Sequence, residues 1–335
     1  MNKIKVGIIG LGVGSKYLET LSRLINCEIS CVSDLSDRKL LQVKKRFKGV
    51  KLTKQASRLI ADPEIEAVFI ASYDHFHYSQ IIESLKRGKH VFVEKPFCRN
   101  MTEANHIKRL LDKGKGRIKF MSNLVLRSAP LYQWLKDQVD HAKFGDIYAV
   151  DGEYLYGRIH KITEGWRGNV KDYSVIQGGG IHLIDLMLWI TGQRPNSLMS
   201  IGNRIATKGS KFRYPDYVVS NLNFSTGMIA RISANFGCVH PHQHILRIFG
   251  TKQTFLYDDK GPRIYRTRNP KDSAKFIKLS PHPRTKGDLI PEFVSSLGSR
   301  RTFKHQYQTF FDDLSVCFAS DRSLHKNAKE KVIYI

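Results

Sequence analysis

The strongest constraint on the fold is a glycine-rich turn between an apolar run and a segment with helical spacing. Residues 4–9 form the apolar run, Gly10-Leu11-Gly12-Val13-Gly14-Ser15 follows it, and residues 17–21 have the helical spacing. This order predicts a buried strand, a tight turn, and a helix whose N-terminal N–H groups point at a bound anion. The third position of the glycine pattern falls at Ser15, which is small enough for a helix to pack closely on a strand. The stretch therefore predicts the first βα unit of a dinucleotide-binding fold.

A second apolar run, residues 28–33, ends at Asp34, which lies 24 residues after Gly10. An acidic side chain at this point takes the adenosine ribose hydroxyls of a dinucleotide and disfavours a 2′-phosphate. Asp34 therefore favours NAD over NADP, and Arg38 is close enough in sequence to weaken that preference. The alternative is that Asp34 caps the helix expected over residues 37–47.

The first third of the chain continues to alternate between helices and strands, as a doubly wound sheet does. Helices are expected over 37–47, 55–61, 81–86 and 102–113, and strands over 67–71, 91–93 and 118–121. We expect residues 1–122 to form a Rossmann domain whose parallel strands end at one edge, where ligands bind.

One strand of this part ends in Glu94-Lys95-Pro96, directly after the apolar run 91–93. Pro96 ends the strand, so Lys95 is expected at the ligand-binding edge of the sheet. There it can donate a hydrogen bond or a proton to an alcohol or carbonyl oxygen, and Glu94 is expected to orient it. The alternative is a solvated charge pair at a strand end.

After residue 123 the pattern changes to alternating strands, at 147–156, 198–206, 217–224, 228–236, 244–249, 254–257 and 263–267. These strands predict a large, mostly antiparallel open sheet. The fold class is therefore α/β, with a Rossmann domain over 1–122 and a C-terminal α/β domain over 123–335. Helices are expected over 131–139, 289–297 and 306–319, and the last is expected to pack back on the first domain.

An apolar helix over residues 178–192 begins with three glycines and carries His182, with Asp185 one turn further on. A polar pair on so apolar a helix is costly unless a ligand or a reaction uses it. The alternative is a core histidine satisfied by Asp185 or by a backbone carbonyl.

A second group of histidines, His240, His242 and His244, is spaced to place imidazoles on one face of a strand. Pro241 disturbs that strand, and no carboxylate nearby in sequence completes a ligand set. We therefore expect no metal site and a loop that leads into the strand.

The composition excludes several classes of protein. The net charge of +25 favours acidic partners, but the basic residues are spread along the chain without a nucleic-acid-binding motif, so no nucleic-acid partner is expected. No apolar run approaches the ~20 residues of a membrane span. Five scattered cysteines and an N-terminus without a signal-peptide layout are typical of a cytoplasmic protein.

Taken together, these motifs resemble those of the Gfo/Idh/MocA family, named for glucose–fructose oxidoreductase and inositol dehydrogenase. The resemblance covers essentially the whole chain. It rests on Gly10-Leu11-Gly12, Ala71-Ser72 with His77, Glu94-Lys95-Pro96, Asn123 with Arg127 and Pro130, Trp166-Arg167, and Gly180-Ile181-His182 with Asp185. It implies an NAD(P)-dependent dehydrogenase or reductase, in a homodimer or homotetramer, that acts on a secondary alcohol or ketone of a sugar, cyclitol or sugar nucleotide.

The resemblance also implies a role for individual residues. Lys95 and His182 match the catalytic pair that handles the proton of the reacting oxygen. The cofactor-binding positions are matched by Gly10, Gly12, Val13, Gly14, Ser15, Asp34, Arg38, Ser72, Tyr73, His77, Glu94 and Lys95. The substrate-binding positions are matched by Asn123, Arg127, Trp166, Arg167, Tyr173, His182 and Asp185.

The chain departs from the family pattern at two places. Gly178 stands where many members carry an aspartate, and Ser72-Tyr73-Asp74 replaces a common Thr-Pro-Asn. Some sugar-nucleotide members also lack the aspartate, which favours that substrate class, as does the basic charge. The alternative function is a catalytically weak NAD-binding sensor, whereas the retained Lys95 and His182 favour an enzyme.

Overall fold

The computed structural model describes residues 3–298 and 304–335, which form two compact units. The first unit comprises the chain up to Ser128, residues 283–311 and Ile335. The second comprises residues 129–282 and 312–334. The chain thus passes into the second unit a few residues after the expected division at 122, and it later returns to the first.

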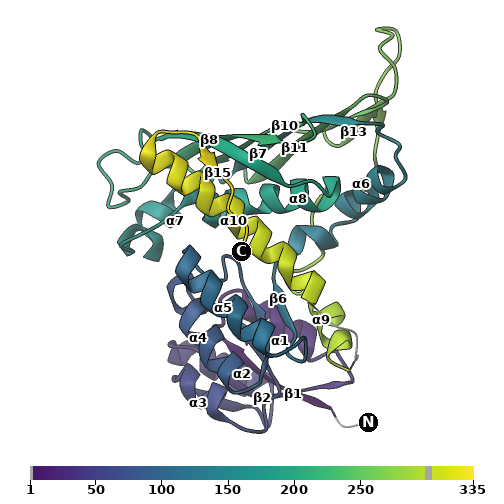
Figure 1. The fold of residues 1–335 in the computed structure, drawn as a ribbon. Helices are drawn as coiled ribbons and strands as arrows, with labels where there is room; N and C mark the ends of the chain where they lie inside the picture. Colours follow the sequence, from purple (N-terminus) through teal and green to yellow (C-terminus); the bar gives the residue numbers. More distant parts are fainter. Residues whose placement is uncertain (1–2, 299–303) are drawn as a thin grey trace. The chain divides into compact units, whose positions relative to one another are not determined.

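The first unit is built on a six-stranded sheet in the order β3-β2-β1-β4-β5-β6, and every neighbouring pair is parallel. Its strands are β1 Ile4–Ile9, β2 Cys27–Ser33, β3 Lys51–Thr53, β4 Ala67–Ile70, β5 His90–Val93 and β6 Phe120–Ser122. Its connecting helices are α1 Gly14–Leu21, α2 Asp37–Arg46, α3 Ala56–Ala61, α4 Asp74–Lys86 and α5 Met101–Lys113 (Figure 1). The strand order reverses between β1 and β4, which is the switch point where such sheets bind ligands.

The segment that returns to the first unit completes its core. Helix α9, Ile290–Leu297, places Phe293 against two strand residues, with ring centroids 5.7 Å from Phe69 and 5.4 Å from Phe92. The long helix α10, Lys304–Lys326, begins in this unit, where Phe311 packs edge-on against Phe97 at 5.2 Å. Because these rings lie far apart in the sequence, their packing joins the last part of the chain to the parallel sheet.

The second unit contains a nine-stranded sheet in the order β14-β13-β12-β11-β7-β10-β9-β8-β15. The β7–β10 pair is parallel and the other recorded pairs are antiparallel. The strands are β7 Ile147–Leu155, β8 Pro195–Asn203, β9 Tyr217–Phe224, β10 Ile229–Asn235, β11 Gln243–Gly250, β12 Thr254–Tyr257, β13 Arg263–Tyr265, β14 Lys275–Phe276 and β15 Glu330–Lys331. Both sheets agree with the α/β fold class expected from the sequence.

Helices of the second unit cover one face of this sheet. Helix α8, Ile181–Thr191, approaches β7 closely, since a Cβ at Gly152 would lie 3.2 Å from that of Leu183. The later part of α10 contacts β8 and β9 through Ser320, whose hydroxyl lies 3.0 Å from that of Ser200 and 2.7 Å from that of Ser220. Figure 1 shows α8 and α10 on the same side of the sheet.

Several elements differ from the expected ones. Helix α4 begins at Asp74 rather than near residue 81, because its first turns are polar and bury His77 instead of an aliphatic residue. A π-helical turn, η3 Ile176–Gly180, precedes α8, so the glycine run forms a widened turn. The remaining helical segments are η1 Val125–Ser128, α6 Pro130–Asp140, α7 His160–Thr163 and η2 Trp166–Asn169. Among the helices described, none has the length and apolar character needed to cross a membrane.

Candidate active site

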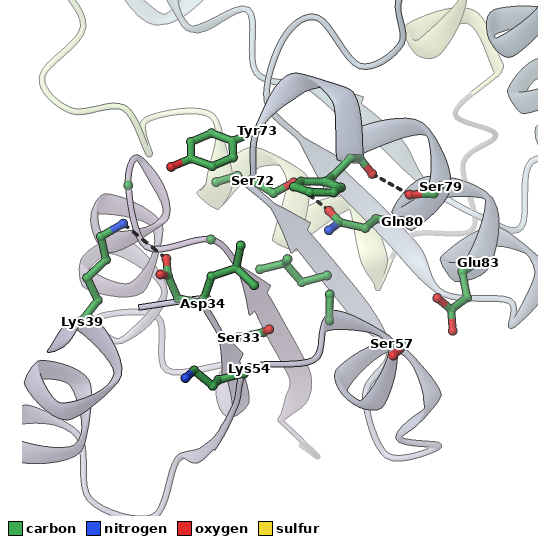
Figure 2. A pocket seen from close by; sticks show the side chains of 17 residues that line it. Ser33, Asp34, Lys39, Lys54, Ser57, Ser72, Tyr73, Ser79, Gln80 and Glu83 are labelled. Atoms are coloured by element: carbon green, nitrogen blue, oxygen red, sulfur yellow. Dashed lines mark hydrogen bonds and ion pairs between the residues drawn. The ribbon is translucent and has the colours of Figure 1, made fainter. Parts of the chain in front are cut away.

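A cavity of about 390 Å³ opens in the first unit beyond the carboxyl ends of β1, β2 and β4. It therefore lies at the point where the strand order reverses. Figure 2 shows Asp34, Lys39, Tyr73 and Gln80 around it. The other lining residues include Gly10, Gly12, Ser33, Leu35, Lys54, Ser72, Phe76 and Glu83.

The glycine turn at this cavity needs glycine for steric reasons. Gly10 has a φ of +87°, and a Cβ on it would lie 2.5 Å from the carbonyl oxygen of Ala71. A Cβ on Gly12 would meet no atom within 4 Å, which leaves room for a ligand to approach the backbone. The glycine pattern suggested that the helix packs closely on the strand at Ser15, but the close packing occurs at Gly14. A Cβ on Gly14 would lie 3.3 Å from side-chain atoms of both Ile8 and Ala71.

Asp34 connects the end of β2 to this glycine turn. Its Oδ2 accepts a hydrogen bond from the Leu11 N–H at 2.6 Å, and its Oδ1 accepts one from the Ser36 N–H at 2.8 Å. Ser36, not Asp34, is the N-cap residue of α2, so the capping alternative is not what the structure shows. The carboxylate keeps further acceptor capacity for ribose hydroxyls. The open glycine turn and this carboxylate therefore suit the pyrophosphate and adenosine ribose of NAD.

The positive charge near Asp34 comes from lysines that sequence reasoning did not single out. Lys39 lies 3.4 Å from Asp34 and lines the cavity with Lys54, whereas Arg38 is exposed and is not among the lining residues. Helical spacing could have identified Lys39 from the sequence. Helix α2 begins at Asp37, and its first turn directs residue 39 toward the end of β2.

Two further loops of the first unit are joined by His77. Its buried ring places Nδ1 at 2.8 Å from the carbonyl oxygen of Pro96 and Nε2 at 3.1 Å from that of Ser72. Ser72 and Tyr73 line the cavity, while His77 is not among its lining residues. In this structure His77 therefore supports the loops after β4 and β5, and its assignment to cofactor contact stays a prediction.

The Glu94 carboxylate is held by two side chains of the first unit. Its Oε1 accepts hydrogen bonds from the Tyr17 hydroxyl and, at 2.7 Å, from Asn123 Nδ2. Burial and the Glu94 carboxylate raise the pKa of Tyr17 well above its ordinary value. That Glu94 orients Lys95 stays a prediction. Lys95 follows the end of β5, in a cis peptide bond with Pro96.

Two of the expected substrate residues have structural contacts within the first unit. Asn123 is buried and also donates to the Lys286 carbonyl at 2.9 Å. Arg127 donates to Thr309 Oγ1 at 3.2 Å and lies over the Phe310 ring at 5.3 Å. These contacts anchor the residues after β6 to the returning segment, and their role toward substrate is untested.

In the second unit, His182 lies in an aromatic cluster. Its ring stacks on Tyr154 with centroids 6.2 Å apart, and it meets His244 edge-on at 5.5 Å. His242 lies 4.9 Å from His244 and 5.2 Å from Tyr154. Burial raises the pKa of the Tyr154 phenol. Among residues 3–298 and 304–335, no group of three His, Cys, Asp or Glu side chains is arranged to hold a metal ion. Asp185 is fully buried one turn after His182.

Gly178, where many family members carry an aspartate, lies against Tyr173. A Cβ at Gly178 would collide with the Tyr173 hydroxyl, so the Tyr173 side chain occupies the space that a larger residue would need there. Arg167 Nε donates to that hydroxyl at 3.0 Å, and its guanidinium lies 4.5 Å over the Trp166 ring. The structure thus brings together three of the expected substrate residues beside the position of the missing carboxylate.

Two sequence models of one family cover most of the chain. The model described as "Oxidoreductase family, NAD-binding Rossmann fold" of GFO/IDH/MocA matches residues 4–121, and that of the GFO/IDH/MocA C-terminal domain matches residues 132–256. The chain belongs to the Gfo/Idh/MocA family. It is therefore an oxidoreductase with an NAD-binding Rossmann domain, as the sequence motifs suggested.

Known members of the Gfo/Idh/MocA family agree with this assignment. The chain is 24% identical over 264 residues to myo-inositol 2-dehydrogenase of Thermotoga maritima, covering 76% of this chain and 75% of that protein. Among solved structures, scyllo-inositol dehydrogenase of Lactobacillus casei with bound NAD(H) and scyllo-inositol matches with a TM-score of 0.76 over 99% of both chains at 20% identity. Levoglucosan dehydrogenase in complex with NADH and L-sorbose matches with a TM-score of 0.80 over 100% of both chains at 18% identity. These structural matches establish the fold.

Proposed function

We propose that this oxidoreductase transfers a hydride between NAD and a secondary alcohol or ketone of a sugar, cyclitol or sugar nucleotide. The observation that carries the proposal is the cavity at the switch point of the parallel sheet, with an open glycine turn and Asp34. The substrate class is supported by the inositol and levoglucosan dehydrogenases among the similar proteins. The sugar-nucleotide option rests on Gly178 and on the basic charge.

In this proposal two side chains handle the proton of the reacting oxygen. Lys95, after β5, donates a hydrogen bond to the reacting oxygen and favours its alkoxide-like form. His182, on α8, takes the proton of that oxygen during oxidation and returns it during reduction. NAD, when bound, supplies the acceptor or donor of the hydride. Positioned acid–base groups of this kind contribute roughly a hundred- to ten-thousand-fold to a rate.

The backbone of the glycine turn and Asp34 would hold the cofactor by its pyrophosphate and adenosine ribose. Tyr73, 46% exposed at the cavity, is placed to cover it from the α4 side. The alternative of a catalytically weak sensor has no support among the similar proteins, which include dehydrogenases.

The test follows reduced-nicotinamide absorbance with a panel of sugars, cyclitols and sugar nucleotides. With the best substrate, Lys95→Ala and His182→Ala are each expected to lower kcat by at least a hundredfold. His182→Ala is expected to change NAD affinity much less than turnover. The matched control is Lys48→Ala, an exposed lysine after α2, which should leave both quantities unchanged. Near-full turnover in His182→Ala would contradict the proposed proton route and leave Tyr156 or Tyr173 as the next candidates.

A further inference from the structure

A second cavity opens in the first unit at the amino ends of β4 and β5. Its volume is about 550 Å³, within the range of roughly 300–1,000 Å³ that is usual for small-molecule sites. The polar side chains that line it belong to Glu66, Arg87, Lys89 and His90. The cavity at the glycine turn lies at the opposite, carboxyl end of β4. The two cavities can therefore hold separate ligands at the same time.

Lys89 lines the second cavity as a buried cation that is not paired with a carboxylate. Its side chain is 5% exposed, and its Nζ donates to the carbonyl oxygens of Asp62 at 2.7 Å and Ile65 at 2.6 Å. The Asp62 carboxylate pairs instead with Lys51, at 3.4 Å. Burial lowers the pKa of Lys89, because an ammonium that leaves water without a counter-charge loses free energy. Two of its three N–H donors are used, so one remains for a ligand of opposite charge.

His90 and Arg87 add further donors to the same lining. The Lys119 N–H donates to His90 Nδ1 at 3.0 Å, so a neutral His90 ring carries its proton on Nε2. Burial lowers the pKa of His90, which favours this neutral form. Arg87 directly follows α4, and its Nε lies 3.6 Å from Glu83 Oε1. The terminal N–H groups of its guanidinium remain for a ligand.

Glu66 is the acidic residue among the described residues that line the second cavity. Its Oε1 accepts a hydrogen bond from the Lys5 N–H at 3.1 Å. Its other oxygen can accept a hydrogen bond from a hydroxyl group. Two cations and a neutral donor are thus combined with one carboxylate, and this set is complementary to a molecule that carries both an anionic group and hydroxyl groups.

We propose that the second cavity binds a hydroxylated organic anion, a sugar phosphate or a sugar acid. Lys89, His90 and Arg87 hold its phosphate or carboxylate group, and Glu66 accepts from one of its hydroxyls. Ammonium and guanidinium groups form short, charge-assisted hydrogen bonds to such oxygens, and the anion supplies the counter-charge that buried Lys89 lacks. This site goes beyond the proposed function and does not depend on it, because it lies at the opposite edge of the sheet from the glycine turn.

The first experiment compares ligands that differ in charge. Glucose, gluconate, glucose 6-phosphate and inorganic phosphate are each titrated calorimetrically into the protein saturated with NADH, so that the glycine turn is already occupied. We expect one site per chain that binds glucose 6-phosphate or gluconate at least tenfold more tightly than glucose. The phosphate and the carboxylate are separate arms, so the titrations also show which anion the cavity takes. Equal affinities for glucose and for both charged sugars would overturn the inference.

The second experiment removes one positive charge inside the lining or one directly beside it. Arg87→Gln should weaken binding of the charged sugar at least threefold. The matched control is Lys86→Gln, at an exposed residue of the same helix end that does not line the cavity, and it should leave the affinity unchanged. Lys89→Gln should weaken binding at least tenfold. Equal effects of Arg87→Gln and Lys86→Gln would place the anion elsewhere on this basic chain and overturn the inference.

A third variant is expected to bind more tightly, which a misfolded protein would not do. Glu66→Gln removes the negative charge from the lining and retains an oxygen for the Lys5 N–H, so inorganic phosphate should bind at least twofold more tightly. Unchanged or weaker phosphate binding in this variant would contradict the proposed position of the anion. None of these measurements uses turnover, so a failure of the proposed function would leave their outcome unaffected.

Discussion

At position 178 the absence of a side chain leaves room for the ring of Tyr173. The Tyr173 hydroxyl occupies the space that a Cβ would need, and it accepts a hydrogen bond from Arg167. A glycine here is therefore complementary to a tyrosine five residues earlier. The loss of the common family aspartate and the presence of Tyr173 are best understood as one linked feature.

Gly178→Ala is expected to destabilise the protein by about 1–3 kcal/mol, because the added methyl group overpacks the site. Removing the obstructing ring should relieve this cost, so Gly178→Ala/Tyr173→Ala should lose less stability than the two single changes added together. Urea unfolding of the four proteins measures the coupling. Additive losses would mean that Tyr173 does not fill this space in solution.

Asp34 and Lys39 act as opposite charges at the cofactor cavity. Asp34→Ala is expected to weaken NADH binding about tenfold and NADPH binding less, because only the ribose diol of NADH gains from the carboxylate. Lys39→Ala should lower the affinity for NADPH relative to NADH, whereas Lys45→Ala, at an exposed position of α2, is the control. Fluorescence titration of the wild type and the three variants with both cofactors measures the eight dissociation constants. A wild type that binds NADPH more tightly than NADH would reverse the assignment.

At the scale of elements, Asp321 of α10 holds the π-helical turn that precedes α8. Its Oδ1 accepts from Ser174 Oγ at 2.6 Å, and its Oδ2 accepts from Gln177 Nε2 at 2.7 Å. These contacts hold Ser174 and Gln177, which precede Gly178, against the long helix α10. Burial raises the pKa of Asp321 from its ordinary 3.8 to about 6.

This raised pKa predicts a pH dependence of stability with a definite sign. The folded protein holds the Asp321 proton more tightly than the unfolded chain, so this contribution is full below about pH 4 and is lost as the pH rises through 6. The loss is on the order of 2–3 kcal/mol, because a difference of one in pKa corresponds to about 1.4 kcal/mol. Compared with Asp321→Asn, the wild type should lose unfolding free energy between pH 4 and pH 7.

The control for this measurement is Asp146→Asn, an exposed aspartate before β7. Urea unfolding of the three proteins at several pH values gives the change of unfolding free energy with pH for each of them. Parallel curves for wild type and Asp321→Asn would show that Asp321 titrates normally in the folded protein.

At the scale of the whole molecule, the helices that the structure describes in the second unit lie on one face of its sheet and leave the other face open (Figure 1). Exposed side chains on it include Ile229 at 57%, Met199 at 43% and Ile201 at 57%. Beside them, Arg231 lies 3.3 Å from both Asp151 and Glu153. An apolar and charged sheet face of this size is typical of an interface.

We therefore expect a homodimer or homotetramer formed through this face. Light scattering at micromolar concentration should give a mass of two or four chains. The double variant Ile201→Asp/Ile229→Asp should lower this mass toward that of a single chain. Ile25→Asp, at an exposed residue before β2, is the control. A strictly monomeric wild type would contradict the expectation.

The sequence by itself determined the elements and the family. Apolar runs at 4–9, 67–71 and 91–93 identified parallel strands, because a strand buried on both faces needs continuous apolar residues. The glycine turn and Asp34 predicted a ligand site at the strand ends, and a cavity of the first unit lies there. Alternation after residue 123 predicted the second sheet for the same reason. The bounds of the elements differ from the expected ones where polar residues are buried, as at the start of α4.

Only the tertiary structure decided which side chains meet. Glu94 accepts hydrogen bonds from Tyr17 and Asn123, which lie 77 and 29 residues away in the sequence. Tyr173 fills the space at Gly178, and Lys39 reaches Asp34 from a helix that the strand order places there. Local periodicity encodes an element and its buried face. Long-range partners depend on strand order and on which helix covers which face, and these follow from packing the whole chain.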